Sequence, residues 1–515
     1  MAESKVFFDK DRNVIPRWRD FRTTVAMGEL NSAQDAEAQW ETEDTDSLAS
    51  KLDAWHLNKS VPFAADVISA AFVLGRHEEA TGAAEFILAQ SDETTETLKS
   101  IANQILTPTT DTDRVQAREK LSILSPEQLR GRIHRLRLNL RNEPRNAIAY
   151  VELARAYTLL DQREPAKAAM RMALKLAPAN RFVLRSASRL FIHTGDHDEA
   201  HQILSSAQPT RFDPWLLSAE IAAASAAEKS SRFAKAGERL LDDLSDSPFE
   251  VTELASALGT LELHNSRSRD ARKLFRKSLV APTENSLAQV EWASRRIAGL
   301  DFVQATQIEV PRNHEAQAWE HYTNGNWKEA LDESWKWLYD QPISPRPAHL
   351  GSFIACSVLE NPEESERILK CALLTNPSDG LLLNNLAFTY ATAGRIKEAQ
   401  ETLTKIKEIE GGESTGIAMK ATQGLIHFRS GNPDIGRRLY REALEGSLRY
   451  SRNFQAMAAL YYAREELLVN SPEAQQAMRI AIDLAKGLED RDIVSLAKRV
   501  GELASVKTQN AFKNH

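Results

Sequence analysis

Four short segments of the sequence share one pattern, and this pattern constrains the fold more than any other feature. Each segment begins with glycine, ends in Glu-Ala and is flanked by apolar residues at helical spacing. The four segments are 75–80, 195–200, 325–330 and 394–399. A glycine between two amphipathic stretches predicts a helix, a turn and a second helix whose inner face begins with a small residue. Four such units predict a chain of stacked helical hairpins.

The clearest repeat covers residues 147–180. Its large and small residues follow a fixed order, which is Tyr150, Leu153, Ala154, Tyr157, Ala166, Met170, Ala173 and Pro178. Small residues let two antiparallel helices approach, large residues fill the space beside them, and a proline cannot continue the second helix. This order resembles the tetratricopeptide repeat. The resemblance implies an all-α protein, a right-handed α-solenoid of stacked helix-turn-helix repeats with a non-repeat N-terminal segment.

The same residue types return at an interval of 34, where the new set is Phe191, Ala200, Leu204 and Ala207. Weaker copies fill most of the chain from about residue 61 onward, so we expect six segments. They are an N-terminal capping or docking segment with an acidic linker (1–60), a first repeat and following helix (61–106), a linker and arginine-rich helix (107–145), central repeats (146–302), C-terminal repeats (303–450), and a degenerate repeat, capping helix and tail (451–515).

Composition narrows the class of protein. The 515 residues carry a formal net charge of −7, which argues against a general nucleic-acid binder, since such proteins usually carry a basic excess. Cys356 and Cys371 fall where the repeat places modest apolar residues, so we expect burial without a disulfide. The N-terminus lacks the apolar core of a signal peptide, and no apolar run approaches the ~20 residues of a membrane span. We therefore expect a soluble cytoplasmic protein.

The N-terminal segment does not follow the repeat. Pro16 can lie in the first turn of a short helix, on which Trp18, Phe21 and Val25 share one face. Six acidic residues follow within residues 35–46 and indicate a linker. Two interpretations remain open. The segment is either a cap that covers the first repeat or an arm that docks on a partner, with Trp18 as a candidate contact.

A second break in the repeat contains an arginine-rich helix. Its apolar stripe is Leu129, Ile133, Leu136 and Leu140. Nine basic residues stand against three acidic ones between Arg114 and Arg145, and arginine forks bind carboxylate or phosphate groups bidentately. A solvated helix face, an anionic protein partner and a nucleic acid are the three interpretations, and the last is the least favoured. The candidate contacts are Arg130, Arg137 and Arg141.

Aromatic residues concentrate in one repeat. Core filling is the simpler interpretation, but Trp supplies a large rigid contact area, so Trp327 and Trp335 are candidate partner-binding residues. Tetratricopeptide proteins that clamp the C-terminal carboxylates of chaperones use lysine, asparagine and arginine on three successive first helices. Asn385 matches only the middle asparagine. We therefore do not expect a chaperone clamp, and we keep Asn385 as a candidate contact.

Motifs for catalysis are missing from the sequence, which has no P-loop, no dinucleotide-binding glycine motif, no nucleophile elbow and no paired Cys-x2-Cys. His193, His197 and His201 form the one tempting metal set, because the last two are four residues apart. They bracket the start of a second helix and lack the residue order of the zinc proteases. We expect surface histidines, and we predict no enzyme activity, no cofactor and no bound metal.

The leading hypothesis for function is a non-enzymatic scaffold or adaptor that binds another protein on its concave helical surface, as tetratricopeptide proteins commonly do. One alternative is a regulatory or sensor subunit that controls an effector enzyme, for instance in bacterial signalling or phage defence. The other is a helical-repeat nucleic-acid binder that uses the arginine-rich helix. The sequence identifies neither the partner nor the oligomeric state.

Overall fold

The regular structure of the chain is helical throughout the part that the computed structural model describes, and no strand occurs there. The described residues are 12–26, 48–74, 77–90, 94, 96–106, 125–244, 247–297, 299–300, 310–406, 412–449 and 452–513. The prediction of an all-α protein is confirmed.

The chain forms two compact units, and the smaller is Arg22–Ser122. Its described helices include one over residues 48–57, α3 (Val61–Leu74), η1 (His77–Ala80), α4 (Thr81–Ala89) and α5 (Glu96–Leu106). They enclose a core that includes Trp55, Ile68 and Ile87. Gly75, the first predicted turn glycine, lies outside the described residues.

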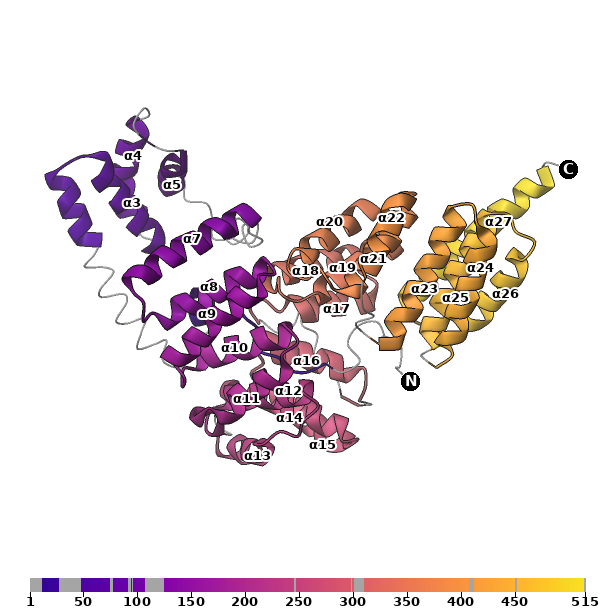
Figure 1. Ribbon diagram of the computed structural model, residues 1–515, viewed down its shortest axis with the longest axis horizontal. Coiled ribbons are helices and arrows are strands. Elements are labelled where there is room, and N and C mark those ends of the chain that lie inside the picture. Colours follow the sequence, from indigo (N-terminus) through magenta and orange to yellow (C-terminus); the bar gives the residue numbers. More distant parts are fainter. Residues whose placement is uncertain are drawn as a thin grey trace. The chain divides into compact units, whose positions relative to one another are not determined.

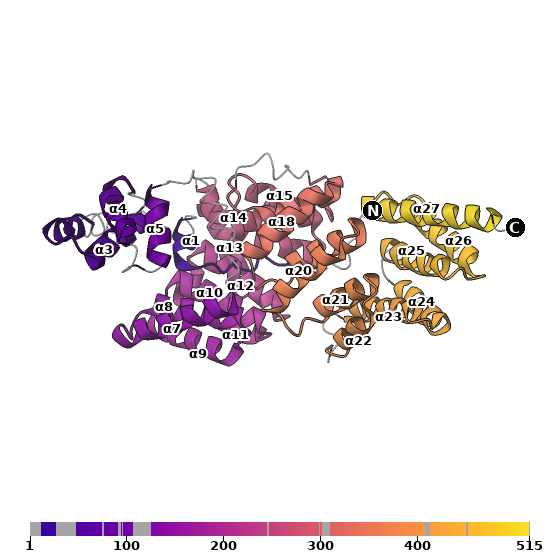
Figure 2. The same ribbon diagram turned by 90° about the horizontal axis from the view of Figure 1, so that it is seen from above.

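The larger unit, Met1–Phe21 with Ile123–His515, is a row of helical hairpins (Figure 1, Figure 2). Its first helices are α7 (Pro126–Asn142), α8 (Ala147–Leu159), α9 (Arg163–Leu176), α10 (Arg181–His193), α11 (His197–Ser206), α12 (Pro214–Ala226), α13 (Ala234–Asp243), α14 (Pro248–His264), α15 (Ser268–Ser278) and α16 (Glu284–Ser294). The row continues with α17 (His314–Asn324), α18 (Trp327–Asp340), α19 (Arg346–Phe353), η4 (Ile354–Val358), α20 (Pro362–Leu373), α21 (Gly380–Thr392), α22 (Ile396–Leu403), α23 (Gly412–Arg429), α24 (Pro433–Ser447), α25 (Arg452–Leu468), α26 (Ala474–Ala485) and α27 (Arg491–Lys513). The leading helix of one hairpin also packs on that of the next, as in the series α10, α12, α14 and α16. This is an α-solenoid.

Local sequence explains why the hairpins form. Gly195, Gly325 and Gly394 adopt φ values of 81°, 76° and 78° at three of the predicted turns, a left-handed conformation that glycine adopts without steric cost. At the start of α8 and α10, the side chains of Asn146 and Asn180 accept hydrogen bonds from backbone N–H groups of the first turn. These caps satisfy donors that have no partner within the helix.

Small residues bring the two helices of a hairpin together. One close approach joins α23 and α24, where a Cβ added to Gly436 would lie 2.9 Å from the carbonyl oxygen of Gly424 and 2.6 Å from the Phe428 ring. No larger residue fits there without moving one helix. The hairpin therefore depends on both glycines.

The prediction of an N-terminal helix that begins near Pro16 is wrong. Residues 12–20 have no regular secondary structure, and α1 begins at Phe21 (Phe21–Ala26). The physical reason is tertiary: Arg17, Trp18 and Arg19 are all buried, whereas a helix packed on one face would leave some of three consecutive side chains in solvent. Contacts with the hairpins override the local helical pattern.

The C-terminal helix α27 packs back on earlier hairpins of the same unit. Tyr322 Oη on α17 donates to Asp492 Oδ2 at 2.7 Å, and Arg499 Nη1 donates to the carbonyl of Val358 at 3.0 Å.

Cys356 is buried, Cys371 is half-buried, and both are free thiols. No helix in the described ranges combines the length and apolarity that crossing a bilayer requires.

Candidate functional site

A segment of the chain itself occupies the inner side of the hairpins. We call residues 12–21 the N-terminal arm. We call the surface that holds it the arm groove, formed by Glu152 and Arg155 on α8, Phe182 on α10, Glu284, Asn285 and Gln289 on α16, Glu315 on α17 and Asp340 on α18. All five helices of the groove belong to the larger unit, as the arm itself does, so the arm is an intramolecular ligand of the repeats.

The groove holds the arm by its backbone. Three carbonyl groups, spaced three residues apart along the arm, each accept a hydrogen bond from a groove side chain. The contacts are Gln289 Nε2 to Arg12 O at 3.2 Å, Asn285 Nδ2 to Ile15 O at 3.1 Å and Arg155 Nε to Trp18 O at 3.5 Å. Every residue has a main-chain carbonyl, so these three contacts do not select particular side chains. They determine where the arm lies in the groove and in which direction it runs.

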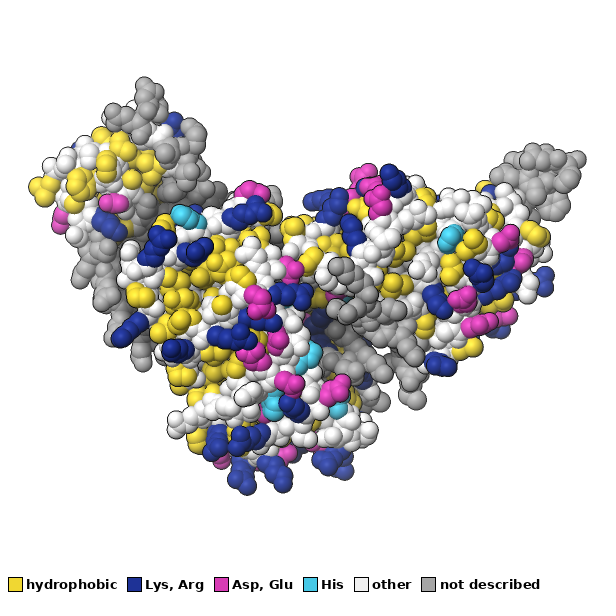
Figure 3. All heavy atoms as spheres, viewed as in Figure 1, with side chains coloured by type: hydrophobic (Ala, Val, Ile, Leu, Met, Phe, Trp, Pro, Cys, Tyr) yellow, Lys and Arg dark blue, Asp and Glu magenta, His cyan; other side chains and the backbone are white. Residues whose placement is uncertain are grey.

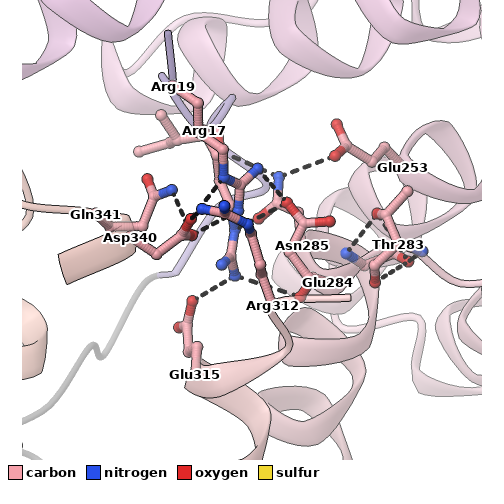
Figure 4. A network of polar contacts seen from close by, with 12 residues as sticks. Arg17, Arg19, Glu253, Thr283, Glu284, Asn285, Arg312, Glu315, Asp340 and Gln341 are labelled. Atoms are coloured by element: carbon pink, nitrogen blue, oxygen red, sulfur yellow. Dashed lines mark hydrogen bonds and ion pairs between the residues drawn. The ribbon is translucent and has the colours of Figure 1, made fainter. Parts of the chain in front are cut away.

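Arginines of the arm provide the sequence-specific part of the contact (Figure 4). Glu315 receives two of them, with Arg12 Nη1 at 2.9 Å from Oε1 and Arg17 Nη2 at 2.7 Å from Oε2. The third, Arg19, lies 2.7 Å from Glu284 Oε1 and also donates to both oxygens of Asp340, with Nε at 2.8 Å from Oδ1 and Nη2 at 2.5 Å from Oδ2. Fork-shaped pairing of this kind is the strong form of a charged hydrogen bond.

Two of the groove carboxylates, Glu315 and Asp340, are held in the ionised form. Burial alone would raise the pKa of Glu315, but Arg12 and Arg346 outweigh it and the pKa lies below its ordinary value. Burial acts in the same direction on Asp340, yet the neighbouring Arg19 holds the pKa of that carboxyl far below its usual range. Because both groups remain charged, arginine is the side chain that fits them.

Apolar side chains complete the contact. Val14 is 1% exposed and joins the core between α12 and α14. Trp18 is 2% exposed. At the end of the arm, Phe21 meets Phe182 edge to face at 5.1 Å, and its backbone N–H donates to Glu152 Oε1 at 3.0 Å. Trp18, predicted as a candidate partner contact, thus lies inside the groove of its own chain.

A second hollow lies beside the C-terminal hairpins. It has a volume of about 130 Å³ and is lined mainly by apolar side chains of η4, α21, α23 and α25 and the residues around them, including Phe353, Phe388, Ile417, Met457 and Tyr461. Its polar lining residues include Asn384 and Asn385. Asn385, a predicted contact, donates to Ser352 Oγ at 3.3 Å. Asn384 is 4% exposed, and its Oδ1 has no hydrogen-bond partner in the described part of the chain.

The remaining predicted site residues lie outside the arm groove. The exposed face of α7 carries Arg130, Arg137 and Arg141, and basic side chains are visible along this helix (Figure 3). Arg130 forms a surface pair with Glu127 at 3.3 Å. Trp327 lies edge to face with Tyr322 at 5.5 Å, and Trp335 Nε1 donates to Glu364 Oε1 at 2.7 Å. Both indoles are half-buried against the core of their repeat.

The expectation of surface histidines does not hold in full, because His193, His197 and His201 are all half-buried. His193 is half-buried, and burial, assisted by Arg189, lowers its pKa to about 3. His201 Nε2 lies 3.1 Å from Glu220 Oε1, a carboxylate with no exposed area. In the described ranges no cluster of three or more His, Cys, Asp or Glu side chains could hold a metal.

Sequence reasoning missed the acceptor side of the groove. A signal was present: Glu253, Glu284 and Glu315 recur at intervals of 31 residues, close to one repeat length. All three are buried. An acid repeated at the same place in successive hairpins indicates one acidic surface, because equivalent positions of a solenoid line up.

The fold and the groove define a class: a helical-repeat protein whose hairpins hold a polypeptide segment without regular secondary structure. Residues 147–180 match the family model described as the tetratricopeptide repeat. The chain is a helical-repeat protein that carries this repeat.

Solved structures that match the fold include a chain from the APC/C hetero-tetramer Cut9–Hcn1, which is 13% identical, with 90% of this chain and 94% of that chain covered and a TM-score of 0.34. Yeast Tom70 also matches, at 12% identity, with 93% and 95% coverage and a TM-score of 0.31. No curated protein gives a sequence match.

Proposed function

We propose that this protein is a non-enzymatic scaffold or adaptor that binds an extended segment of a partner protein on the inner surface of its helical hairpins. One observation carries the proposal. The repeats already hold a non-helical segment, the N-terminal arm, through backbone carbonyls, ion pairs and buried apolar side chains. A surface that binds its own chain in this way has the groups that recognise a peptide.

The hollow beside the C-terminal hairpins supports the same function. Its wall is apolar, and the buried Oδ1 of Asn384 requires a donor. An apolar side chain of a partner would fill the hollow, while a backbone N–H of that partner would satisfy Asn384. The half-buried Asn385 lies beside it on α21 and is accessible from the same side.

Site-specific cross-linking tests the proposal. A photoreactive amino acid at Asn385 should trap a partner protein in the native cell, identified by mass spectrometry. The matched control is the same amino acid at Lys397, whose side chain is 90% exposed on the neighbouring helix α22. We expect cross-links at residue 385 and none at residue 397. Cross-links confined to residue 397, or absent from both, would contradict binding on the inner surface.

A further inference from the structure

The hairpins make their own helix contacts without the arm. Around the arm groove, α14 packs on α16, α16 on α17 and α17 on α18. The arm adds no helix to this series, because its residues before Phe21 have no regular structure. It lies against the row of hairpins as a bound peptide would, held by its side chains, by three carbonyl groups and by the backbone N–H of Phe21.

The arm also fills the groove incompletely. Arg17 Nη1 and Trp18 Nε1 in the arm, and Gln289 Oε1 in the groove, are buried and have no hydrogen-bond partner among the described residues. Beside Asn13 and Pro16 a cavity of about 370 Å³ remains against the hairpins. Buried polar groups without partners cost free energy, so another segment could fit this groove better.

Charge defines which segment would fit. The arm arginines contact three groove carboxylates, Glu284, Glu315 and Asp340. The hairpins themselves provide two arginines to these carboxylates, since Arg346 pairs with Glu315 and Arg312 lies 2.9 Å from Asp340. Glu284 receives neither of these arginines, and its ion-pair partners in the described structure are Arg17 and Arg19 of the arm. A basic segment in place of the arm would supply such a partner to this buried carboxylate.

We propose that the arm groove is an exchangeable binding site for a basic, extended segment of a partner protein, and that the arm is the internal occupant which this segment displaces. The inference rests on the scaffold function proposed above and names the chemistry of the partner. The fitting segment carries an aromatic residue with one arginine directly before it and one directly after it, as Trp18 has Arg17 and Arg19. An apolar residue stands three positions before the first arginine, in the place of Val14.

Peptide binding to the full chain tests this exchange. The probe is a fluorescein-labelled peptide with the sequence of residues 10–22, and its binding is measured by fluorescence anisotropy. The double variant Arg17→Glu and Arg19→Glu should release the arm, because each new carboxylate would face a groove carboxylate. We expect this variant to bind the probe about tenfold more tightly, or better, than the wild type.

Two controls identify the groove as the binding site. Adding Glu315→Gln and Asp340→Asn to the double variant should lower affinity for the probe about tenfold or more, because both fork-shaped acceptors are lost. A probe with glutamine in place of its arginines should not bind. If the double variant keeps its helical circular dichroism and cooperative melting but does not bind the probe, the exchange is refuted.

A second measurement applies if the double variant fails to fold. A protease site inserted within residues 27–47 of the otherwise wild-type chain would separate the arm from the hairpins after folding. We expect the cleaved arm to be replaced by excess labelled probe, as seen by native mass spectrometry. Retention of the cleaved arm for hours would refute the proposal. The proposal would also be refuted if the wild-type protein formed a dimer that the double variant cannot form, because the groove would then bind a second copy of this chain. Neither result would affect cross-linking at Asn385.

Discussion

Single charged side chains determine where the N-terminal arm lies. A buried charge is tolerated only when it is paired, because removing it from water costs several kcal/mol. Arg17 and Arg19 have side chains 5% and 3% exposed, and carboxylates compensate both. From the sequence alone an arginine is assigned to the surface, so this burial could not be predicted from the arm by itself. The burial of these arginines can be inferred only when the arm is considered together with the acidic residues that recur at repeat spacing, Glu253, Glu284 and Glu315.

The buried state of His193 has a consequence for stability. Its pKa of about 3 in the folded protein lies below the value of about 6.5 for an exposed histidine. Between these values the unfolded chain binds a proton that the folded chain does not. The free energy of unfolding should therefore fall by roughly 1 kcal/mol between pH 6.5 and pH 5.5 through this residue.

Denaturant unfolding at these two pH values measures the effect. His193→Gln should remove its share of the pH dependence, since glutamine does not titrate. At each pH, the free energy of unfolding of the variant is subtracted from that of the wild type. This subtraction cancels the contribution of the other titrating groups. An equal difference at both pH values would show that His193 does not titrate as its burial implies.

Individual hairpins follow from local sequence, whereas the arm does not. The turn glycines and the asparagine caps act within a few residues of where they stand, so their positions could be read directly. Pro16, Trp18, Phe21 and Val25 also form a local pattern, but here the partners lie far away in sequence. Arg19 contacts Asp340 across 321 residues. A local sequence pattern contains no information about contacts with residues far away in the sequence. The prediction of a helix that begins near Pro16 was wrong for that reason.

The α23–α24 hairpin offers a test of close helix packing. Gly436→Ala places a methyl group 2.6 Å from the Phe428 ring and 2.9 Å from the Gly424 carbonyl. We expect a loss of roughly 1–3 kcal/mol in the free energy of unfolding, because the helices must separate. Gly501→Ala on α27 is the control, since nothing lies within 4 Å of the added carbon. It should stabilise by roughly 0.5–1 kcal/mol. Equal effects would contradict the packing argument.

At the scale of the molecule, the net charge of −7 conceals two surfaces of opposite character. Acidic side chains are buried in the arm groove, where they bind arginine, while Arg130, Arg137 and Arg141 of α7 are exposed. Arg132 of the same helix is half-buried and pairs with Glu152 of the groove. The two features belong to the same compact unit, yet no contact of Arg130, Arg137 or Arg141 with the groove is present in the described structure. Their roles are therefore separable by substitution.

The arginine-rich helix distinguishes a protein partner from a nucleic acid. Charge reversal at Arg130, Arg137 and Arg141 should preserve the fold, because these side chains are exposed while Leu129 and Ile133 supply the buried contact. We expect the wild-type protein to ignore oligonucleotides at physiological salt, since a nucleic-acid site usually shows a basic excess over a wider surface. Affinity for an anionic protein should fall in the variant. The control carries the same charge change at Lys397, Lys420 and Lys498. Tight oligonucleotide binding that weakens steeply from 50 to 200 mM salt, and that is lost only in the arginine variant, would assign α7 to nucleic acid instead.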